Sequence, residues 1–377
     1  MYDFNVSDSD IIPAPEEFQR RLPADARIAK VVGQARHALC DILDRRDPRL
    51  FIVVGPCSIH DPVAGLDYAR RLRILQDEVA DVLLLVMRVY FEKPRTTTGW
   101  KGLINDPDLD GTYRIAKGME RARRFLLDVC DLGLAAATEA LDPVSPHYLG
   151  DLVAWTAIGA RTTESQIHRE LASGLPTPVA FKNGTDGDIG VAVNAILAAA
   201  RPHARIGINA DGRVSVLNSK GNRHGHLVLR GGNDRPNYDA VSVGLAEQAL
   251  ARAGLPANIV VDCAHGNSYK NPALQPMVMR GITSQIRDGN QSLVGAMIES
   301  NLEAGNQAIP DDLSKLKYGC SITDACADWD ATEDMILGAA DELRAVRSLL
   351  LARCGMTPAA KQYIPAARGS IGLLARD

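Results

Sequence analysis

The sequence lacks any long apolar run, any excess of basic residues and any regular cysteine pattern. No apolar stretch reaches about 18 residues, the length that a membrane-spanning helix needs, so we expect no membrane span. The 42 Lys and Arg residues are outnumbered by 46 Asp and Glu residues, and the net charge of -4 argues against a nucleic-acid partner. The seven cysteines show no regular spacing, so free thiols in a reducing cytoplasm fit better than a disulfide scaffold.

The N-terminal residues, MYDFNVSDSDIIPAPEEF, are acidic and contain no apolar core. They therefore differ from a secretory signal, and we expect a cytoplasmic location. The remaining composition is ordinary for a globular protein, with 46% hydrophobic and 23% charged residues. A length of 377 residues suggests two or three domains, although closed α/β barrels often run longer as one domain.

Eight apolar segments of strand length alternate with amphipathic segments of helix length. Most of the eight are nearly continuous apolar runs, which are typical of parallel strands covered on both faces. They span residues 51–54, 83–90, 134–139, 157–160, 179–182, 226–230, 259–263 and 293–299. Eight such βα units predict an α/β protein with a (β/α)8 TIM barrel, and a doubly wound open sheet is the alternative.

Helix start signals precede several of the intervening segments. Asp61 followed by Pro62 predicts a helix that begins behind a capping carboxylate. Two further pairs have the spacing of a capping box: Thr163 with Gln166, and Asp330 with Glu333. The second pair is expected to start a long helix that ends near residue 352.

Three segments lie outside a minimal barrel. Residues 1–45 form an N-terminal extension in which residues 26–43 are predicted to be a helix. Residues 203–225 form an insertion before the sixth strand, where RIGIN and RVSVL around the turn ADG predict a β-hairpin. The barrel itself is expected over residues 46–352, followed by an irregular C-terminal tail over residues 353–377.

Ionisable side chains stand at or just after the ends of the predicted strands. Along the chain they are Cys57, Arg88, Lys93, Arg95, Glu139, Arg161, Lys182, Arg230, Asp262, His265, Glu299 and, in the loop SITDAC, Asp324. A barrel brings the C-terminal ends of its strands to one mouth, where barrel active sites are built. Burying so many ionisable groups is costly unless they are paired or bound to a ligand, so the pattern predicts an active site at this mouth.

Six of these residues are cationic although the protein is negatively charged. They are Arg88, Lys93, Arg95, Arg161, Lys182 and Arg230. Arginine binds carboxylate and phosphate in a bidentate manner, whereas lysine supplies a point charge and can donate a proton. The cluster predicts two small phosphorylated substrates, or one substrate with several anionic groups. Ordinary salt bridges are the alternative for any single arginine, but they explain all six much less well.

A second group offers ligands for a metal. Its members are Cys57, His265, Glu299 and Asp324. A thiolate, an imidazole and two carboxylates suit a borderline divalent ion such as Mn, Fe, Co or Zn. Only a barrel would bring these distant residues together, and a small buried hydrophobe is the alternative for Cys57. His60 is interpreted as part of a helix entry, and His224 and His226 as structural or solvent-facing residues.

Eight motifs in one order resemble a known family. They are GPCSIHDP, FEKPRTTTGWKGL, AIGARTTESQIHRE, FKNGTDG, LRGG, CAHGNS, ESNLEAGNQ and YGCSITDAC. From about residue 15 to about residue 350 the chain resembles the feedback-regulated, microbial type I 3-deoxy-D-arabino-heptulosonate 7-phosphate (DAHP) synthases. The resemblance implies a (β/α)8 barrel. It also implies condensation of phosphoenolpyruvate with D-erythrose 4-phosphate and water to DAHP and phosphate, the first step of the shikimate pathway to aromatic amino acids.

The resemblance also implies roles for individual residues. The metal ligands would be Cys57, His265, Glu299 and Asp324. Phosphoenolpyruvate would be held by Arg88, Lys93, Arg161, Lys182 and Arg230, with Glu139 nearby, and the phosphate of erythrose 4-phosphate would meet Arg95 and Thr96. The catalytic residues would be Lys93, Cys57, His265 and Glu139. Lys93 is the expected proton donor to the developing alkoxide, whereas the group that activates the attacking water stays open between Glu139 and the metal.

Regulation is implied by the resemblance as well. In that family an N-terminal extension and a hairpin before the sixth strand form an aromatic amino-acid feedback site and subunit contacts. This chain has both segments, which implies feedback inhibition and a homodimer or homotetramer. EALDPVSPHYLGDL and RIGINADGRVSVL are most similar to tyrosine-sensitive members, while phenylalanine and tryptophan stay open. The alternative is that the extension merely caps the bottom of the barrel.

Two other functions remain as alternatives. One is a related barrel synthase that joins phosphoenolpyruvate to arabinose 5-phosphate, against which the loop KPRTTTGWKG argues. The other is a sensor without catalysis that binds aromatic amino acids. The complete set of six cations and four metal ligands argues against such a sensor. Ala264 departs from the family pattern, in which many members have serine before the histidine, but the ligand itself is unchanged.

Overall fold

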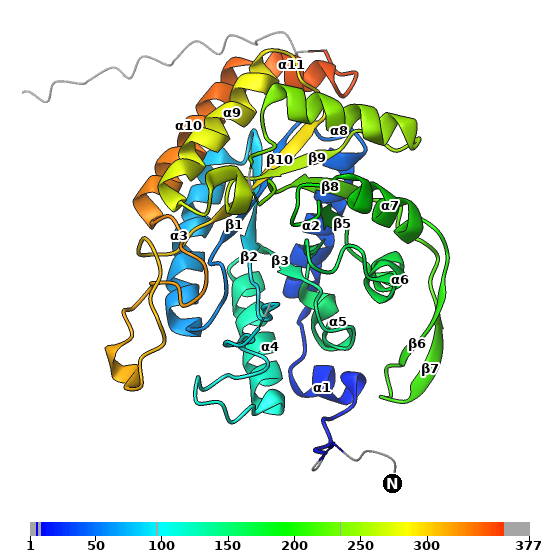
Figure 1. The fold of residues 1–377 in the computed structure, drawn as a ribbon, viewed down its shortest axis with the longest axis vertical. Coiled ribbons are helices and arrows are strands. Elements are labelled where there is room, and N and C mark those ends of the chain that lie inside the picture. Colours follow the sequence, from blue (N-terminus) through cyan, green and yellow to red (C-terminus); the bar gives the residue numbers. More distant parts are fainter. Residues whose placement is uncertain (1–4, 7–8, 96, 234, 358–377) are drawn as a thin grey trace, which may run out of the picture.

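Eight parallel strands close into a barrel in the order β1-β10-β9-β8-β5-β4-β3-β2 (Figure 1). The computed structural model describes residues 5–6, 9–95, 97–233 and 235–357. The barrel strands are β1 Leu50–Gly55, β2 Leu83–Arg88, β3 Ala135–Glu139, β4 Trp155–Ile158, β5 Val179–Lys182, β8 Gly225–Leu229, β9 Ile259–Asp262 and β10 Leu293–Glu299. The predicted TIM barrel is confirmed, each strand end lies within two residues of its prediction, and the open-sheet alternative is excluded.

The strands are buried on both faces, which explains their continuous apolar sequence. All residues of β1 and β10 are buried. Within β1, Phe51 and Val53 belong to a core inside the barrel, while Ile52 and Val54 pack in the larger core between strands and helices. The period of two along a strand produces this division.

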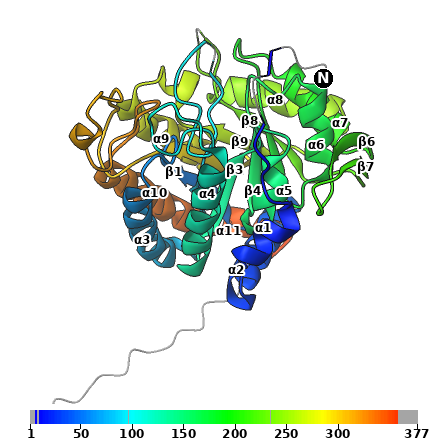
Figure 2. The same ribbon diagram turned by 90° about the horizontal axis from the view of Figure 1, so that it is seen from below.

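Helices surround the barrel and are amphipathic or apolar toward it (Figures 1 and 2). They are α1 Pro15–Arg21, α2 Ala26–Leu43, α3 Pro62–Val79, α4 Ile115–Asp131, α5 Ser145–Leu149, α6 Gln166–Gly174, α7 Gly190–Ala199, α8 Ala240–Arg252, α9 Gln275–Arg287, α10 Trp329–Ala345 and α11 Arg347–Ala352. Short 3-10 turns span Gly150–Leu152, His265–Ser268, Pro272–Leu274 and Leu313–Lys315. In the part of the chain that the structure describes, no helix combines the length and the apolar character needed to cross a membrane.

One predicted helix cap is confirmed and two are wrong. Asp61 accepts hydrogen bonds from the backbone of Val63 and Ala64 at the start of α3. Thr163 does not cap α6, because its buried hydroxyl donates instead to the carbonyl oxygens of Gly159 and Lys182, each at 2.9 Å.

The second capping box is wrong by two residues. Asp328 precedes α10 and accepts a hydrogen bond of 2.8 Å from the backbone nitrogen of Ala331. This acceptor satisfies a free N–H of the first turn, so Asp330 lies inside the helix rather than at its cap. The helix ends at Ala345, and a separate short helix, α11, reaches Ala352.

The N-terminal extension lies against the barrel and touches the inserted hairpin. Helix α2 has the predicted bounds, and its Leu39, Ile42 and Leu43 join the core inside the barrel. The hairpin consists of β6 Ala204–Ile208 paired antiparallel with β7 Val214–Asn218, and it stands beside α6 and α7 (Figures 1 and 2). The backbone nitrogen of Glu16 donates to the carbonyl of Ala210 in the hairpin turn at 3.0 Å.

The described start of the C-terminal tail is attached to the barrel. The Arg353 guanidinium donates to the carbonyl oxygens of Leu293, Pro48 and Arg49 at 3.3, 3.2 and 2.8 Å. Residues 358–377 of the predicted tail lie outside the described residues.

Candidate active site

Most of the polar residues that follow the strands meet at one end of the barrel. Side chains from β2 and β10 pair with each other, as do side chains from β5 and β9. The loops after β1 and β10 add a thiol and a further carboxylate at the same place. The closed barrel brings these distant segments together, as the strand-end pattern predicts.

Arg88 is the most buried cation of this group. One terminal nitrogen donates to Glu299 Oε1 at 2.8 Å, and Nε donates to the carbonyl of Pro56 at 3.1 Å. The guanidinium carbon lies 3.7 Å from the centre of the Tyr90 ring, a cation–π geometry. Its other terminal nitrogen is buried and has no hydrogen-bond partner among the described residues. An orphaned buried donor of this kind fits a bound anion.

Lys93 joins the cations to the sulfur of Cys57. The buried Lys93 Nζ donates to Cys57 Sγ at 3.0 Å and to the Cys57 carbonyl at 3.2 Å. Burial alone would lower the pKa of Lys93. The neighbouring Cys57 and Glu299 raise this pKa by more than burial lowers it, so the net shift is upward and the ammonium persists. Burial raises the pKa of the Cys57 thiol, and the charge of Glu299 adds to that rise against the opposing effect of Lys93.

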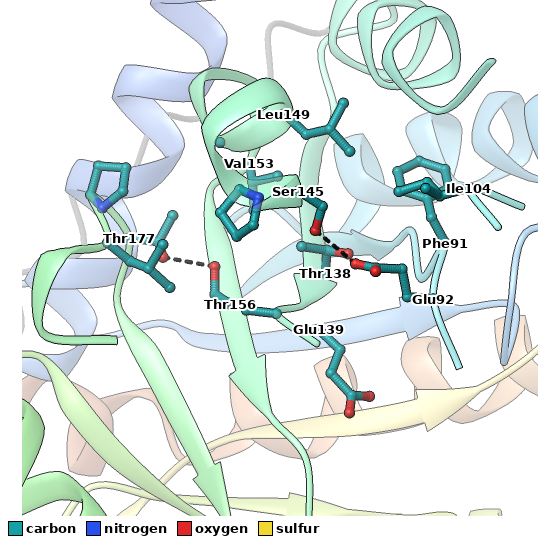
Figure 3. Close-up of a pocket in the computed structure, with 15 residues that line it drawn as sticks. Phe91, Glu92, Ile104, Thr138, Glu139, Ser145, Leu149, Val153, Thr156 and Thr177 are labelled. Carbon is teal, nitrogen blue, oxygen red and sulfur yellow. Dashed lines mark hydrogen bonds between the residues drawn. The ribbon is translucent and has the colours of Figure 1, made fainter. Parts of the chain in front are cut away.

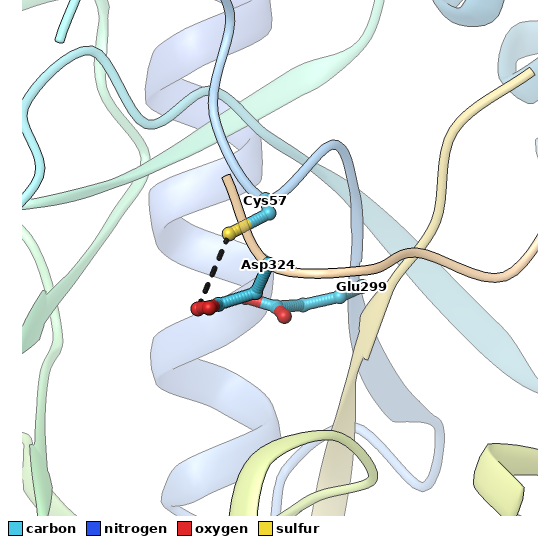
Figure 4. Close-up of side chains that lie close together, drawn as sticks. All are labelled: Cys57, Glu299 and Asp324. Carbon is cyan, nitrogen blue, oxygen red and sulfur yellow. Dashed lines mark hydrogen bonds between the residues drawn. The ribbon is translucent and has the colours of Figure 1, made fainter. Parts of the chain in front are cut away.

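Three potential metal ligands form a tight cluster (Figure 4). One ligand atom each of Cys57, Glu299 and Asp324 lies within 4.8 Å of the others. The Cys57 sulfur and Asp324 Oδ2 are 3.7 Å apart. Burial raises the pKa of Glu299, but His265 and the nearby cations lower it more, so its pKa falls below the ordinary value and the carboxylate is ionised.

His265 approaches this cluster without joining it at that distance. Its Nε2 lies 3.7 Å from Glu299 Oε1, its Nδ1 lies 3.0 Å from Asp262 Oδ2, and its side chain is 17% exposed. The backbone of His265 has φ of 54°, a left-handed conformation that is uncommon for a residue other than glycine. Such strain is typical of functional sites.

A second buried ion pair lies between β5 and β9. Lys182 Nζ donates to Asp262 Oδ2 at 2.8 Å. Burial raises the pKa of Asp262, but Lys182 and His265 hold it well below its ordinary value. Lys182 and Arg88 therefore each have a carboxylate partner in the structure.

Three other cations have no carboxylate partner within the described residues. They are Arg95, Arg161 and Arg230. Arg230 is buried, and both burial and repulsion from Arg161 lower its pKa. Arg161 is exposed, and Arg95 donates to the carbonyl of Trp100 at 2.8 Å. Two cations close enough to repel each other favour an anionic ligand between them. Thr96, the predicted companion of Arg95, lies outside the described residues.

Glu139 lies at the end of β3, close to the chain after β4. A side-chain carbon added at Gly159 would lie 2.2 Å from Glu139 Oε1, so a larger residue there would displace this carboxylate. Figure 3 shows the Glu139 carboxylate pointing away from the side chains of Ser145 and Glu92. No side-chain hydrogen bond ties this buried carboxylate to another described residue.

Two carboxyl groups of this region were not predicted to have a role. Asp262 stands at a predicted strand end without a predicted role, although it pairs with the predicted site residues Lys182 and His265. Glu92 accepts a hydrogen bond of 2.8 Å from Ser145 Oγ beside a small apolar cavity of about 30 Å³ (Figure 3), and burial raises its pKa to about 8. The only feature of the sequence that points to Glu92 is its position in a loop between Phe91 and Lys93.

A separate, larger hollow lies between the hairpin and helices α5 and α6. It has a volume of about 500 Å³, and its wall includes His147, Glu170, Leu175, Arg205 and Leu217. A terminal nitrogen of Arg205 lies 3.4 Å from His147 Nε2. The wall thus combines apolar side chains with groups of both charge signs.

The model of the DAHP synthetase I family matches residues 23–336. The chain belongs to the DAHP synthetase I family. It is 52% identical over 331 residues to the Tyr-sensitive phospho-2-dehydro-3-deoxyheptonate aldolase of Salmonella typhimurium, covering 88% of this chain and 93% of that relative. It is 48% identical over 345 residues to the Phe-sensitive enzyme of Escherichia coli, covering 92% and 98%.

A solved structure supports membership of the DAHP synthetase I family. The phospho-2-dehydro-3-deoxyheptonate aldolase of Francisella tularensis superposes with a TM-score of 0.88 at 42% identity, covering 90% of this chain and 99% of that one. A Thermotoga maritima aldolase of the same name has a TM-score of 0.52 at 19% identity and shows a shared fold only.

Proposed function

We propose that this chain condenses phosphoenolpyruvate with D-erythrose 4-phosphate and water to give DAHP and phosphate. The family supports this activity. One structural observation carries it to this chain: Lys93 Nζ lies 3.0 Å from Cys57 Sγ. If Lys93 is the proton donor, this contact would put it beside a proposed metal ligand and among the cations, as a reaction between an anionic nucleophile and a polarised aldehyde requires.

The donor set fits a borderline divalent cation such as Mn, Fe, Co or Zn. Cys57, Glu299 and Asp324 offer a sulfur and two carboxylates in one cluster. We propose that these three hold the ion together with His265, whose Nε2 lies 3.7 Å from Glu299. When bound, the ion supplies Lewis acidity toward the aldehyde oxygen.

The cations orient the first substrate and screen its charge. Arg161 and Arg230 are proposed to bind phosphoenolpyruvate, since neither has a carboxylate partner among the described residues. Arg88 contributes its unpartnered nitrogen, and Lys182 contributes an ammonium fixed by Asp262. Holding the anions in fixed positions lowers the barrier, because the repulsion between two phosphorylated substrates is screened before they react.

Three protons move in the proposed reaction. The methylene carbon of phosphoenolpyruvate attacks the aldehyde carbon, and Lys93 donates a proton to the developing alkoxide. Water then adds to the electron-poor carbon that carries the phosphate. The adduct loses phosphate as the carbon–oxygen bond to it breaks, and the proton of the new hydroxyl passes to the departing phosphate. We propose Glu139 as the base that takes the proton of this water, because its buried carboxylate has no side-chain partner in the described part of the chain. Arg95 and Thr96 are proposed to hold the phosphate of erythrose 4-phosphate.

An aromatic amino acid is the proposed feedback inhibitor, with tyrosine favoured. The relatives are named Tyr-sensitive and Phe-sensitive, which describes those proteins. The hollow of about 500 Å³ beside the hairpin offers Arg205 for a carboxylate, Glu170 for an ammonium and apolar side chains for a ring. Inhibition by each of the three aromatic amino acids, compared between the protein and an Arg205→Ala variant, tests this assignment.

Residues 1–45 and the hairpin are proposed to serve regulation and assembly around the barrel of residues 46–352. The outer face of the hairpin exposes Ile206, Val214 and Val216, an apolar surface that a second copy would cover. We propose a homodimer or homotetramer in the cytoplasm. Sedimentation of the protein and of a Val216→Lys variant tests the contact, and an unchanged mass of the variant would contradict it.

Turnover of the two substrates tests the main proposal. Phosphate release from phosphoenolpyruvate should require erythrose 4-phosphate and a divalent metal. Release with arabinose 5-phosphate in place of erythrose 4-phosphate would support the rival synthase. Binding of tyrosine without any turnover would support the sensor.

A further inference from the structure

A cysteine, a histidine and an aspartate form a line at the opposite end of the barrel. Cys40 lies near the end of α2, Asp44 directly follows that helix, and His224 directly precedes β8. Cys40 Sγ lies 3.5 Å from His224 Nδ1, and His224 Nε2 lies 3.2 Å from Asp44 Oδ2. The candidate active site lies at the C-terminal ends of the strands, so the two groups are distinct.

The hydrogen bonds determine which nitrogen of His224 carries a proton. Burial raises the pKa of Asp44, but hydrogen bonds from His224 and Arg46 lower it more, so this carboxylate is ionised and can only accept. His224 Nε2 must therefore donate to Asp44. In the neutral imidazole, Nδ1 is then an acceptor that faces the Cys40 thiol, the arrangement of a nucleophile, a base and a group that orients the base.

The Cys40 thiol needs such a base. Burial raises its pKa, and the charges of Asp44 and Asp41 raise it further, so the resting group is a thiol. It is only partly buried, and the adjacent His224 side chain is 16% exposed, so the group lies near the protein surface. Arg46 and Arg223 also contact Asp44, at 2.8 and 3.3 Å, and hold its carboxylate beside His224.

We propose that Cys40 is a modification site, at which His224 and Asp44 activate the thiol for exchange with small neutral disulfides. As Cys40 Sγ attacks one sulfur of the reagent, the thiol proton passes to His224 Nδ1. The new sulfur–sulfur bond forms while the reagent's bond breaks, and the departing thiolate takes the proton from His224. One reagent disulfide and one protein thiol thus become one mixed disulfide and one free small thiol.

The other cysteines provide internal standards for this proposal. Five are buried: Cys57, Cys130, Cys263, Cys320 and Cys326. Cys354 is partly buried like Cys40, but its neighbours are the guanidinium groups of Arg353 and Arg45 rather than an imidazole. A comparison of Cys40 with Cys354 therefore separates activation by a base from simple exposure.

The test measures the rate of mixed-disulfide formation at each cysteine. The full-length protein is treated with bis(2-hydroxyethyl) disulfide at one pH, quenched at intervals, and each cysteine is quantified by peptide mass spectrometry. We expect Cys40 to react at least about tenfold faster than Cys354, since general-base catalysis contributes a factor of about 100 to 10,000. His224→Asn should slow Cys40 at least about tenfold, and Asp44→Asn should slow it several-fold, while Cys354 keeps its rate.

The matched control is His37→Gln. His37 lies on the same helix, is exposed, and contacts Asp41 at 3.3 Å instead of the thiol, so its replacement should leave the Cys40 rate unchanged. Reaction of the buried Cys130 would show that a variant is unfolded. If one of the variants His224→Asn and Asp44→Asn is unfolded, the Cys40 rate is taken from the other. Equal rates at Cys40 and Cys354, or an unchanged Cys40 rate in a folded His224 or Asp44 variant, would overturn the proposal.

Discussion

The two ends of the barrel use buried polar groups in opposite ways. At the mouth, Arg88 and Lys182 pair with carboxylates across strands and lie beside cations without carboxylate partners in the described chain. The floor of the barrel is the end at which the strands begin. There, Trp155 Nε1 donates to His226 Nε2 at 3.0 Å, and His226 Nδ1 donates to the His224 carbonyl at 3.0 Å. Burial lowers the pKa of His226 to about 4, so this histidine is neutral.

The difference shows how one framework separates stability from chemistry. Neutral, mutually satisfied groups at the floor add specific hydrogen bonds at little electrostatic cost. Charged groups at the mouth are costly to bury and are retained where a ligand of opposite charge completes them. Variants of the charged groups at the mouth should therefore change activity, whereas variants of buried groups that are neutral should change stability.

The largest effect is expected for Cys57→Ala at the mouth. Loss of the sulfur removes one member of the metal cluster, so metal-dependent phosphate release should fall at least about a thousandfold. Cys130→Ala, which removes a buried thiol on α4, is the control and should keep most of the activity. Near-normal turnover by the Cys57 variant would refute the metal assignment, and equilibrium dialysis with Mn²⁺ reads the binding directly.

The next effect concerns Glu92, a carboxyl on the mouth side. Its pKa is raised to about 8 by burial, so its contribution to stability is complete below about pH 4.5 and is lost as pH rises to 8. Glu92→Gln should remove that loss, which amounts to about 5 kcal/mol of unfolding free energy across this range. Urea titrations at several pH values measure it, with the exposed Glu120→Gln as control. Parallel pH curves for the protein and Glu92→Gln would contradict the expectation.

The floor should show the opposite sign of pH dependence. His226 has a lowered pKa, so its contribution to stability is present above about pH 6.5 and disappears as pH falls toward 4. A fall of about 3 kcal/mol in unfolding free energy is expected over that range. His226→Gln keeps a donor and an acceptor without titrating, so its curve should be flatter, and an identical acid slope would count against a neutral floor.

The smallest effect is expected for Arg161→Ala. Because Arg161 is exposed and faces Arg230, its loss should leave the fold intact. The KM for phosphoenolpyruvate should rise by a factor of about 10 to 50, as expected when one charge-assisted contact is lost. Arg124→Ala on the surface of α4 is the control. A KM within twofold of the parent would exclude Arg161 from the substrate site.

Much of the fold follows from local sequence. The continuous apolar runs predicted all eight barrel strands, and the turn ADG between alternating segments predicted the hairpin. The predicted helix cap at Thr163 is wrong because its hydroxyl bonds to the backbone carbonyl of Lys182, in the distant strand β5. Propensity rules describe neighbours in the chain, and a tertiary partner can override them.

The site follows the same division. Residue types at strand ends, together with the family motifs, identify the set of side chains that a barrel brings to its mouth. The pairing within that set depends on closure of the barrel, which places Cys57 and Asp324 3.7 Å apart across 267 positions of sequence. Only the tertiary structure gives Arg88 and Lys182 their carboxylates, leaves His265 at the edge of the metal cluster, and aligns Cys40 with His224 and Asp44. Strand formation depends on near neighbours along the chain, whereas these contacts depend on packing between distant segments.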